Sequence, residues 1–95
     1  MNNIFTVLLS DSAEKDLKKI PKPIIKKLRT WVLAVSEFGL IEVSKIKGYH
    51  DEPLKGDRAG QRSIRLNRSY RAIYQILVNG DVEFIEIQEV NKHDY

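Results

Sequence analysis

The chain has 95 residues, of which 42% are hydrophobic and 31% are charged, and its formal net charge is +3. This length and balance indicate one globular domain over residues 1–95, large enough to bury its own core. The absence of cysteine excludes disulfides and thiolate metal sites, and two histidines are too few for a zinc site, so we expect no metal and no cofactor. No apolar run approaches the roughly 20 residues that span a membrane, and residues 1–5 lack the features of a signal peptide. We therefore expect a cytoplasmic protein that makes no membrane contact.

Charge is distributed unevenly along the chain. Basic side chains outnumber acidic ones in residues 45–71, whereas residues 81–89 carry acidic side chains and no basic one. A chain polarised in this way can present a positive face to a polyanion. The same pattern also fits a solvated surface with ordinary ion pairs, so charge alone leaves both interpretations open.

The first part of the chain predicts a strand followed by a helix. Residues 4–9 are rich in β-forming side chains and predict the strand. The segment Ser10-Asp11-Ser12 is a helix-start signal, and Glu14 follows Asp11 by three residues, as in a capping box. Pro21 ends this helix because proline is not tolerated in a helix interior.

A second helix is predicted to begin near Pro23 and to end at Gly39. Its apolar side chains recur at helical spacing: Ile24, Leu28, Trp31, Val32 and Val35. Because Trp31 belongs to this stripe, we expect it in the core. Residues 40–47 predict a short third helix.

The rest of the chain predicts a loop and three strands. Residues 48–60 contain three glycines and a proline and predict a loop, and structureless loops of this length are often functional. Strands are predicted at 61–67, 70–78 and 82–90, with Asn79-Gly80 as a hairpin turn. The sequence therefore predicts an α+β domain with an N-terminal strand, a two-helix hairpin and a three-strand antiparallel meander, in which the helices pack on one sheet face.

Alternation along residues 70–78 assigns side chains to the two faces of the sheet. The predicted buried face carries Tyr70, Ala72, Tyr74, Ile76 and Val78. The predicted opposite face carries Arg71, Ile73 and Gln75. In the preceding strand, Arg65 is expected on that second face as well.

The candidate site combines side chains that can act as acid, base or phosphate clamp: Glu52, Lys55, Arg65, Arg71, His93 and Tyr95. RNA supplies its own nucleophile, the 2′-hydroxyl, so its cleavage needs a base, an acid and cations that hold the phosphorane charge, but no metal. Arginine suits the clamp because its planar fork matches phosphate oxygens, and histidine can be the acid near neutral pH. Taken singly, each residue also has an ordinary explanation as solvated surface or chain end.

Three segments resemble a known family: His50-Asp51-Glu52-Pro53-Leu54-Lys55-Gly56, Gly60-Gln61-Arg62-Ser63-Ile64-Arg65-Leu66-Asn67 and Tyr70-Arg71-Ala72-Ile73-Tyr74. Their order and spacing resemble the RelE/ParE toxin superfamily, most closely its HigB, YoeB and RelE branch of mRNA interferases, over nearly the whole chain. The resemblance implies a RelE-like fold and the toxin of a type II toxin–antitoxin system, an endoribonuclease that cuts messenger RNA in the ribosomal A site. The partners it implies are a cognate antitoxin, the 70S ribosome and mRNA.

The resemblance also implies a role for each site residue. Glu52 resembles the general base, and Lys55 matches the lysine of the family's Pro-Leu-Lys motif. Arg65 falls where the family places a basic residue on a strand, and Arg71 matches its phosphate-gripping arginine.

At the end of the chain, His93 resembles the family's general acid and Tyr95 the tyrosine that orients or stacks the RNA. Asp94 separates the two here, whereas the related toxins have them adjacent. Three further arginines are predicted to make salt-sensitive contacts with RNA or the ribosome: Arg58, Arg62 and Arg68. His50 is predicted to be a structural residue of the loop.

Two other functions fit the same sequence. The ParE branch of the superfamily shares the fold but poisons DNA gyrase and cuts no RNA, and a fold does not decide a function. A plain RNA- or ribosome-binding module would need the basic face, but neither Glu52 nor His93. The presence of a loop glutamate together with a terminal histidine and tyrosine favours RNA cleavage.

Overall fold

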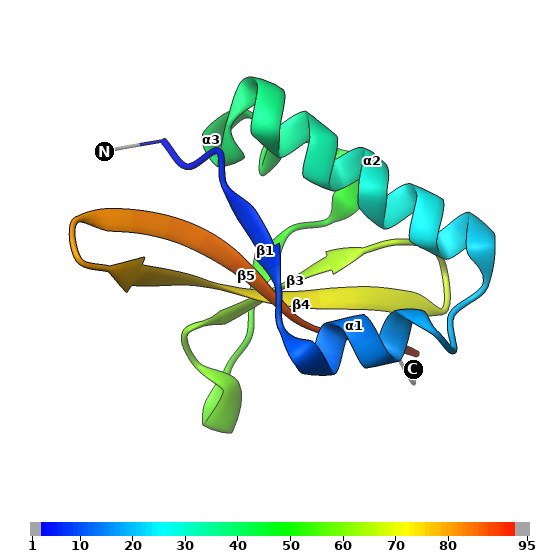
Figure 1. The fold of residues 1–95 in the computed structure, drawn as a ribbon. Helices are drawn as coiled ribbons and strands as arrows, with labels where there is room; N and C mark the ends of the chain where they lie inside the picture. Colours follow the sequence, from blue (N-terminus) through cyan, green and yellow to red (C-terminus); the bar gives the residue numbers. More distant parts are fainter. Residues whose placement is uncertain (1–2, 93–95) are drawn as a thin grey trace.

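In the computed structural model, which describes residues 3–92, a five-stranded sheet lies beneath one long helix (Figure 1). Its elements are β1 (Val7–Leu9), α1 (Asp11–Leu17), α2 (Lys22–Phe38), α3 (Leu40–Val43), η1 (Lys47–Tyr49), β2 (Glu52–Pro53), η2 (Gly56–Arg58), β3 (Gln61–Arg65), β4 (Tyr70–Asn79) and β5 (Val82–Lys92), where η denotes a 3₁₀ turn. The strand order is β1-β5-β4-β3-β2. This confirms the predicted α+β fold, with an N-terminal strand, a helical pair and the antiparallel meander β3-β4-β5.

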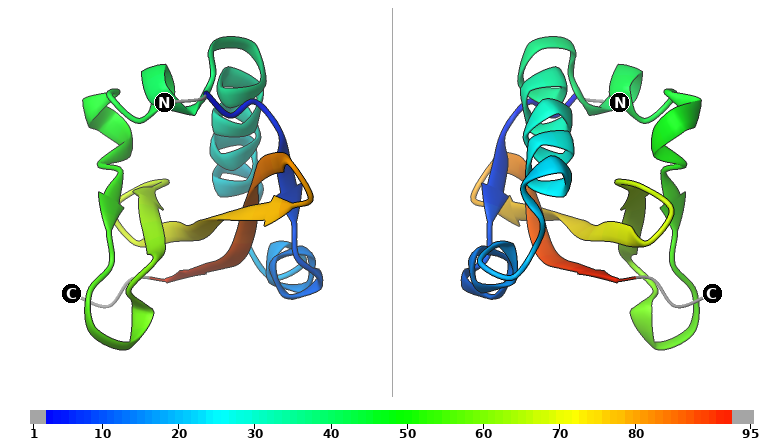
Figure 2. Two further views of the ribbon diagram at one scale, coloured as in Figure 1. Left: turned by 90° about the vertical axis from the view of Figure 1, so that its left-hand side faces the viewer. Right: turned by 90° about the vertical axis from the view of Figure 1, so that its right-hand side faces the viewer.

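The first and last strands lie side by side. β1 pairs with β5 in parallel, with Val7 opposite Ile85 and Leu9 opposite Ile87. Where β1 ends, α1 continues along the same edge of the sheet, and the Asp16 carboxylate accepts a hydrogen bond from the Val90 amide at 3.0 Å (Figure 2). The edge of β5 is therefore covered by a strand and then by a helix.

Helix α1 begins one residue earlier than a capping box at Asp11 and Glu14 would require. Ser10 is the N-cap, and its hydroxyl accepts a hydrogen bond from the Ala13 amide at 3.1 Å. The third helical position is then Ala13 and not Glu14, so the capping-box interpretation was wrong, although the helix-start signal was placed correctly.

Helix α2 packs the predicted apolar stripe on the sheet. Ile24, Leu28, Trp31 and Val35 are buried along it. It ends at Gly39, whose φ of +86° favours glycine. A Cβ atom there would also lie 2.1 Å from the Asn3 side chain, so no other residue fits without a shift.

Two loop predictions need correction. The third helix covers only Leu40–Val43 rather than 40–47, because Ile46 has an extended backbone before η1. Residues 48–60 are not structureless: Glu52–Pro53 forms an edge strand on β3, with Glu52 opposite Ser63. Proline is compatible with such an edge position, where its missing N–H is not needed.

The far end of strand β4 was also assigned wrongly. Ala72 and Tyr74 are buried as predicted, and Tyr70 packs against the core, but Ile76 and Val78 are 39% and 65% exposed. The β4–β5 hairpin projects beyond the helices, which leaves this end of the strand outside the helical layer (Figure 1). The alternation of side chains along β4 correctly predicted which face of the sheet they occupy. It could not predict how far the helices extend over that face.

Replacing Tyr74 with alanine is expected to lower the free energy of unfolding by about 3–5 kcal/mol, as for other large aromatic core residues. Its side chain is 1% exposed and its ring centre lies 5.3 Å from that of Trp31. Denaturant unfolding measures this loss, and Tyr70→Ala is the control with a smaller expected cost because Tyr70 is only half-buried. An unchanged melting temperature in Tyr74→Ala would show that the packing of β4 is not as described.

Candidate functional site

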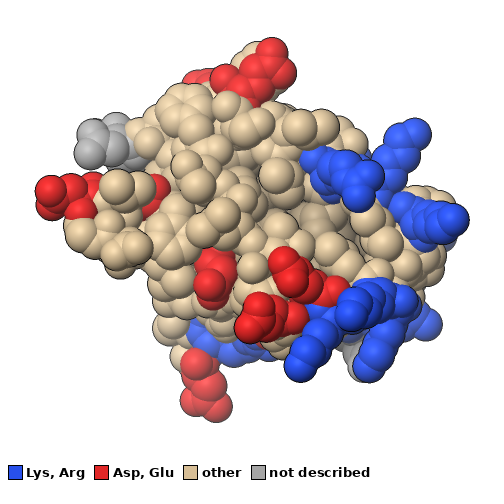
Figure 3. All heavy atoms as spheres, in the orientation of Figure 1, with Lys and Arg blue, Asp and Glu red and all other residues tan. Residues whose placement is uncertain are grey.

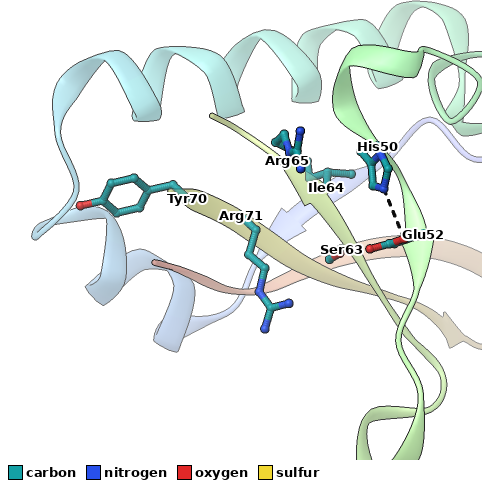
Figure 4. Close-up of a pocket in the computed structure, with 7 residues that line it drawn as sticks. All are labelled: His50, Glu52, Ser63, Ile64, Arg65, Tyr70 and Arg71. Carbon is teal, nitrogen blue, oxygen red and sulfur yellow. Dashed lines mark ion pairs between the residues drawn. The ribbon is translucent and has the colours of Figure 1, made fainter. Parts of the chain in front are cut away.

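A pocket of about 140 Å³ opens at the β3–β4 end of the sheet (Figure 4). Its lining residues are His50, Glu52, Ser63, Ile64, Arg65, Tyr70 and Arg71. They come from the end of η1, from β2, and from the paired strands β3 and β4. Three of the predicted site residues therefore meet in one place: Glu52, Arg65 and Arg71.

The strand register places two arginines in directly opposed positions on neighbouring strands. Arg65 on β3 lies directly opposite Arg71 on β4. Like charges in directly opposed cross-strand positions repel each other and destabilise the sheet. Both side chains line the pocket, and Figure 4 shows the Arg71 side chain extending away from Arg65, so the two cations border different parts of it.

The Arg71 guanidinium has unused hydrogen-bonding capacity. Its Nε is buried and has no hydrogen-bond partner among residues 3–92. Leaving a buried donor unsatisfied costs about 1–3 kcal/mol, and more for a charged group. An oxygen acceptor with negative charge, such as a phosphate oxygen, would satisfy this donor and match the fork of the guanidinium.

On the opposite wall of the pocket, His50 and Glu52 face each other. The His50 Nε2 and Glu52 Oε2 atoms are 3.5 Å apart, and both side chains are more than half exposed (Figure 4). His50 has a left-handed backbone with φ of 48°, an uncommon conformation for a residue with a side chain. His50 was predicted to be a structural residue of the loop, whereas it lines the pocket beside Glu52. Because its backbone is left-handed and not extended, alternation along the sequence could not have indicated this pair.

Between these two residues, Asp51 points the other way, into the protein. Its side chain is fully buried, and it accepts hydrogen bonds from the Arg62 Nε at 2.8 Å and the Tyr74 hydroxyl at 2.7 Å. Burial raises the pKa of Tyr74 well above its usual value, and the hydrogen bond to Asp51 raises it further. This buried network, Asp51–Arg62–Tyr74, fastens the segment that carries His50 and Glu52 to β3 and β4.

The exposed sheet face is not open over its whole width. The Arg58 Nε donates to the Gln61 side chain at 2.8 Å, and its guanidinium also pairs with Glu89 on β5, so Arg58 reaches across β4. Gln88 links to Gln61 on one side and donates to Gln75 at 2.9 Å on the other. Because these polar side chains bond one another, the face is accessible mainly at the pocket.

The other predicted site residues lie around or outside the pocket. Lys55 is exposed at the start of η2 and is not part of the described pocket lining. Arg62 is held by Asp51 on the helix-facing side of β3, and Arg68 is exposed in the β3–β4 turn. His93 and Tyr95 lie outside the described residues. Contacts of Arg58, Arg62 and Arg68 with RNA stay predictions.

A second basic region surrounds the turn between α1 and α2. Figure 3 shows Lys and Arg gathered on that side of the molecule, at the right, with acidic side chains directly beside the lower part of this group and others farther away on the same face. Five exposed lysines lie in this turn or in the adjoining parts of the two helices: Lys15 in α1, Lys18 and Lys19 in the turn, and Lys22 and Lys26 in α2. The predicted positive face lay in residues 45–71, and the fold adds a second group of basic side chains outside them.

The family of the chain follows from its similarity to known proteins. A family model described as the ParE toxin of type II toxin–antitoxin systems (parDE) matches residues 7–93. The chain belongs to the ParE toxin family. This confirms the predicted RelE/ParE superfamily, although the matching model bears the name of the branch that the sequence analysis placed second.

Solved toxin structures share the fold of this ParE-family chain. The YoeB/ParE toxin from Agrobacterium tumefaciens has a TM-score of 0.70 and 20% sequence identity, covering 94% of this chain and 99% of its own. YafQ from E. coli strain BL21(DE3) has a TM-score of 0.70 and 18% identity, covering 92% and 91%. The toxin in the E. coli DinJ–YafQ complex has a TM-score of 0.69 and 19% identity, covering 95% and 94%. No curated protein is significantly similar to the chain in sequence.

Two further structural observations concern this ParE-family chain. Within residues 3–92, no group of three or more His, Cys, Asp or Glu side chains is arranged to hold a metal ion. In the same part of the chain, no helix is both long and apolar enough to cross a membrane.

Replacing Asp51 with asparagine is expected to destabilise the ParE-family toxin by about 1–3 kcal/mol, because the Arg62 guanidinium and the Tyr74 hydroxyl lose their charged hydrogen-bond acceptor. Amide hydrogen exchange at residues 49–54 should also accelerate, since the segment loses its attachment to the sheet. Asp57→Asn is the matched control, because Asp57 is an exposed carboxylate of the same loop. Equal stability and exchange in the two variants would contradict the anchoring role.

The stability of the toxin is expected to fall as pH rises above 10, the usual pKa of tyrosine. Because the folded state raises the pKa of Tyr74, the folded protein holds that proton more tightly than the unfolded chain does. The stabilisation is complete below pH 10 and is lost progressively toward the raised folded-state pKa. Tyr74→Phe should show a shallower fall in the free energy of unfolding between pH 9 and 11, and identical slopes would refute the buried hydroxyl as the cause.

Proposed function

We propose that this toxin is a messenger-RNA endonuclease that acts on the ribosome and cleaves RNA at the pocket lined by Glu52, Arg65 and Arg71. The observation that carries the proposal is the Arg71 guanidinium, which lines the pocket with a buried, unsatisfied Nε and lies opposite a second arginine. Two arginines and a carboxylate in one small pocket meet the needs of phosphoryl transfer to an RNA 2′-hydroxyl, namely charge stabilisation and proton transfer.

In this mechanism Arg71 and Arg65 bind the non-bridging oxygens of the scissile phosphate. Their positive charge is most useful in the transition state, where the phosphorane carries more negative charge than the substrate. Glu52, on the opposite wall of the pocket, takes part in removing the proton from the 2′-hydroxyl. Lys55, in the loop that follows β2, adds positive charge, and His93 and Tyr95 are the proposed acid and RNA-orienting group.

The charge distribution supports a ribosomal site of action and a protein inhibitor. The basic α1–α2 region and the arginines near the pocket give the toxin two positive surfaces for ribosomal RNA. The structurally similar YafQ was solved in complex with DinJ as a toxin–antitoxin pair. We propose that this chain likewise has a cognate antitoxin, with an acidic segment that complements its basic surface.

Gyrase inhibition is the second candidate, because the family model that matches the chain is that of ParE. Gyrase inhibition does not require a pocket that combines two arginines with a carboxylate. We therefore favour RNA cleavage over gyrase inhibition. A non-catalytic RNA-binding module is less favoured, because the pocket lining is mainly charged and polar and contains one tyrosine, Tyr70, whereas RNA-recognition sheets stack two or three bases on aromatic rings.

Replacing Arg71 with alanine is expected to lower the cleavage rate by on the order of 10²–10³-fold, as for other single transition-state contacts, without unfolding the toxin. The measurement maps the 5′ ends of a translated mRNA by primer extension after brief induction. Arg68→Ala is the matched control, because it removes one positive charge from the adjacent turn and leaves the pocket lining intact. It should lose only a few-fold in activity, mostly through weaker binding.

Cuts within translated codons for the wild type and Arg68→Ala, but not for Arg71→Ala, would support the proposal. Growth arrest with uncut transcripts and inhibited supercoiling in a gyrase assay would instead establish the ParE-type activity. Cleavage by Arg71→Ala at the wild-type rate would show that Arg71 does not take part in the reaction.

A further inference from the structure

His50 exposes its imidazole in the pocket although the backbone around it is anchored to the core. Its neighbours on both sides are fixed: the Tyr49 side chain is 6% exposed, and the Asp51 carboxylate is fully buried against Arg62 and Tyr74. The His50 amide also donates to the Lys47 carbonyl at 3.0 Å. The backbone that carries the imidazole is therefore held rigidly, while the imidazole itself remains 59% exposed in the pocket.

The left-handed backbone at His50 turns its side chain toward Glu52. With φ of 48° and ψ of 49°, the chain reverses at the end of η1, and the ring nitrogen Nε2 comes to lie 3.5 Å from Glu52 Oε2 (Figure 4). This distance is long for a hydrogen bond, and catalytic contacts commonly shorten when substrate binds. Glycine would adopt this backbone more easily than histidine. The sequence thus places an imidazole where the backbone alone favours glycine.

We propose that His50 and Glu52 form a proton-transfer dyad, in which His50 is the general base and Glu52 orients it. This rests on the proposed function. Glu52 accepts a hydrogen bond from the His50 Nε2–H, which leaves the Nδ1 lone pair for the substrate, and the Glu52 carboxylate stabilises the imidazolium that forms. The same arrangement occurs in hydrolases, where a carboxylate orients the histidine that acts as the general base. Imidazole is also a better base near neutral pH than a solvent-exposed carboxylate.

The reaction step is balanced in protons and bonds. The proton of the RNA 2′-hydroxyl moves to His50 Nδ1 as the 2′-oxygen attacks phosphorus, and the bond from phosphorus to the 5′-oxygen breaks. The 5′-oxygen receives a proton from the acid of the reaction, for which His93 is the predicted residue. The products are a 2′,3′-cyclic phosphate and a 5′-hydroxyl, and His50 returns its proton to solvent. Arg71 neutralises the phosphorane between these events.

The test compares His50→Asn with the wild type in single-turnover cleavage of an mRNA on translating ribosomes, across a range of pH. Asparagine tolerates the left-handed conformation well, so this variant keeps the loop and removes only the proton-transfer group. The rate is expected to fall by on the order of 10²–10⁴-fold, the usual contribution of a general base. The part of the pH profile in which the wild-type rate rises with pH should flatten.

Two further variants separate a dyad from a positioning effect. Glu52→Gln combined with His50→Asn should cleave no more slowly than His50→Asn alone, because residues that act as one unit have non-additive effects. His50→Gly should recover part of its activity when free imidazole is added, which a structural role would not allow. Asp57→Asn is the control for removing a loop carboxylate outside the pocket.

The outcomes distinguish this inference from the proposed function. If His50→Asn cleaves at the wild-type rate with an unchanged pH profile while Arg71→Ala is inactive, the RNA-cleaving function stands and the dyad is refuted. If the wild type itself cuts no RNA on ribosomes, the proposed function fails and the dyad falls with it. Loss of activity in His50→Gly that imidazole does not restore, together with additive losses in the double variant, would also overturn the dyad.

Discussion

The buried carboxylate of Asp51 holds the functional part of the molecule together. Through Arg62 it is tied to β3, and through the Tyr74 hydroxyl to β4, while its neighbours on either side point outward into the pocket. A charge buried this completely is tolerated only because both its partners are well placed. The geometry of the pocket thus depends on an interaction within the core, and the same ring that satisfies the carboxylate also packs on Trp31 beneath α2.

The two ends of the exposed sheet face differ in how completely their polar side chains are hydrogen-bonded. Toward β5, side chains from three strands and from η2 satisfy one another, so that region is rigid and offers few unused hydrogen-bonding groups. Toward the β3–β4 turn, Arg71 keeps an unused donor. The buried side-chain atoms without a partner among residues 3–92 are Trp31 Nε1, Arg71 Nε and Asn91 Oδ1, and Asn91 on β5 lies directly opposite Arg71. An unsatisfied donor and an unsatisfied acceptor therefore lie together at this end of the sheet face, where a ligand could complete them.

Much of the fold could be predicted because it depends on local patterns. The apolar stripe of α2, the glycine that ends it and the alternation that puts Arg65 and Arg71 on one face all follow from short-range periodicity. The exposure of Ile76 and Val78 depends on how far α2 extends over the sheet, which no local pattern contains. The sequence Asp51-Glu52 shows two adjacent carboxylates, and only the tertiary fold reveals that the first is structural and the second lines the pocket. His50 was missed for the same reason, since its backbone conformation is set by the anchoring of its neighbours.

The parallel pairing of β1 with β5 has a consequence for the synthesis of the protein. The first strand to leave the ribosome obtains its partner only when the last strand follows, so closing this part of the sheet requires a loop that spans most of the chain. Pairings of such high sequence separation are slow to form and come late in folding. The pocket strand β4 lies next to β5 and pairs with it over its whole length, whereas its pairing with β3 covers only residues 71–75. The pocket on β3 and β4 can therefore form completely only after β5 has joined the sheet.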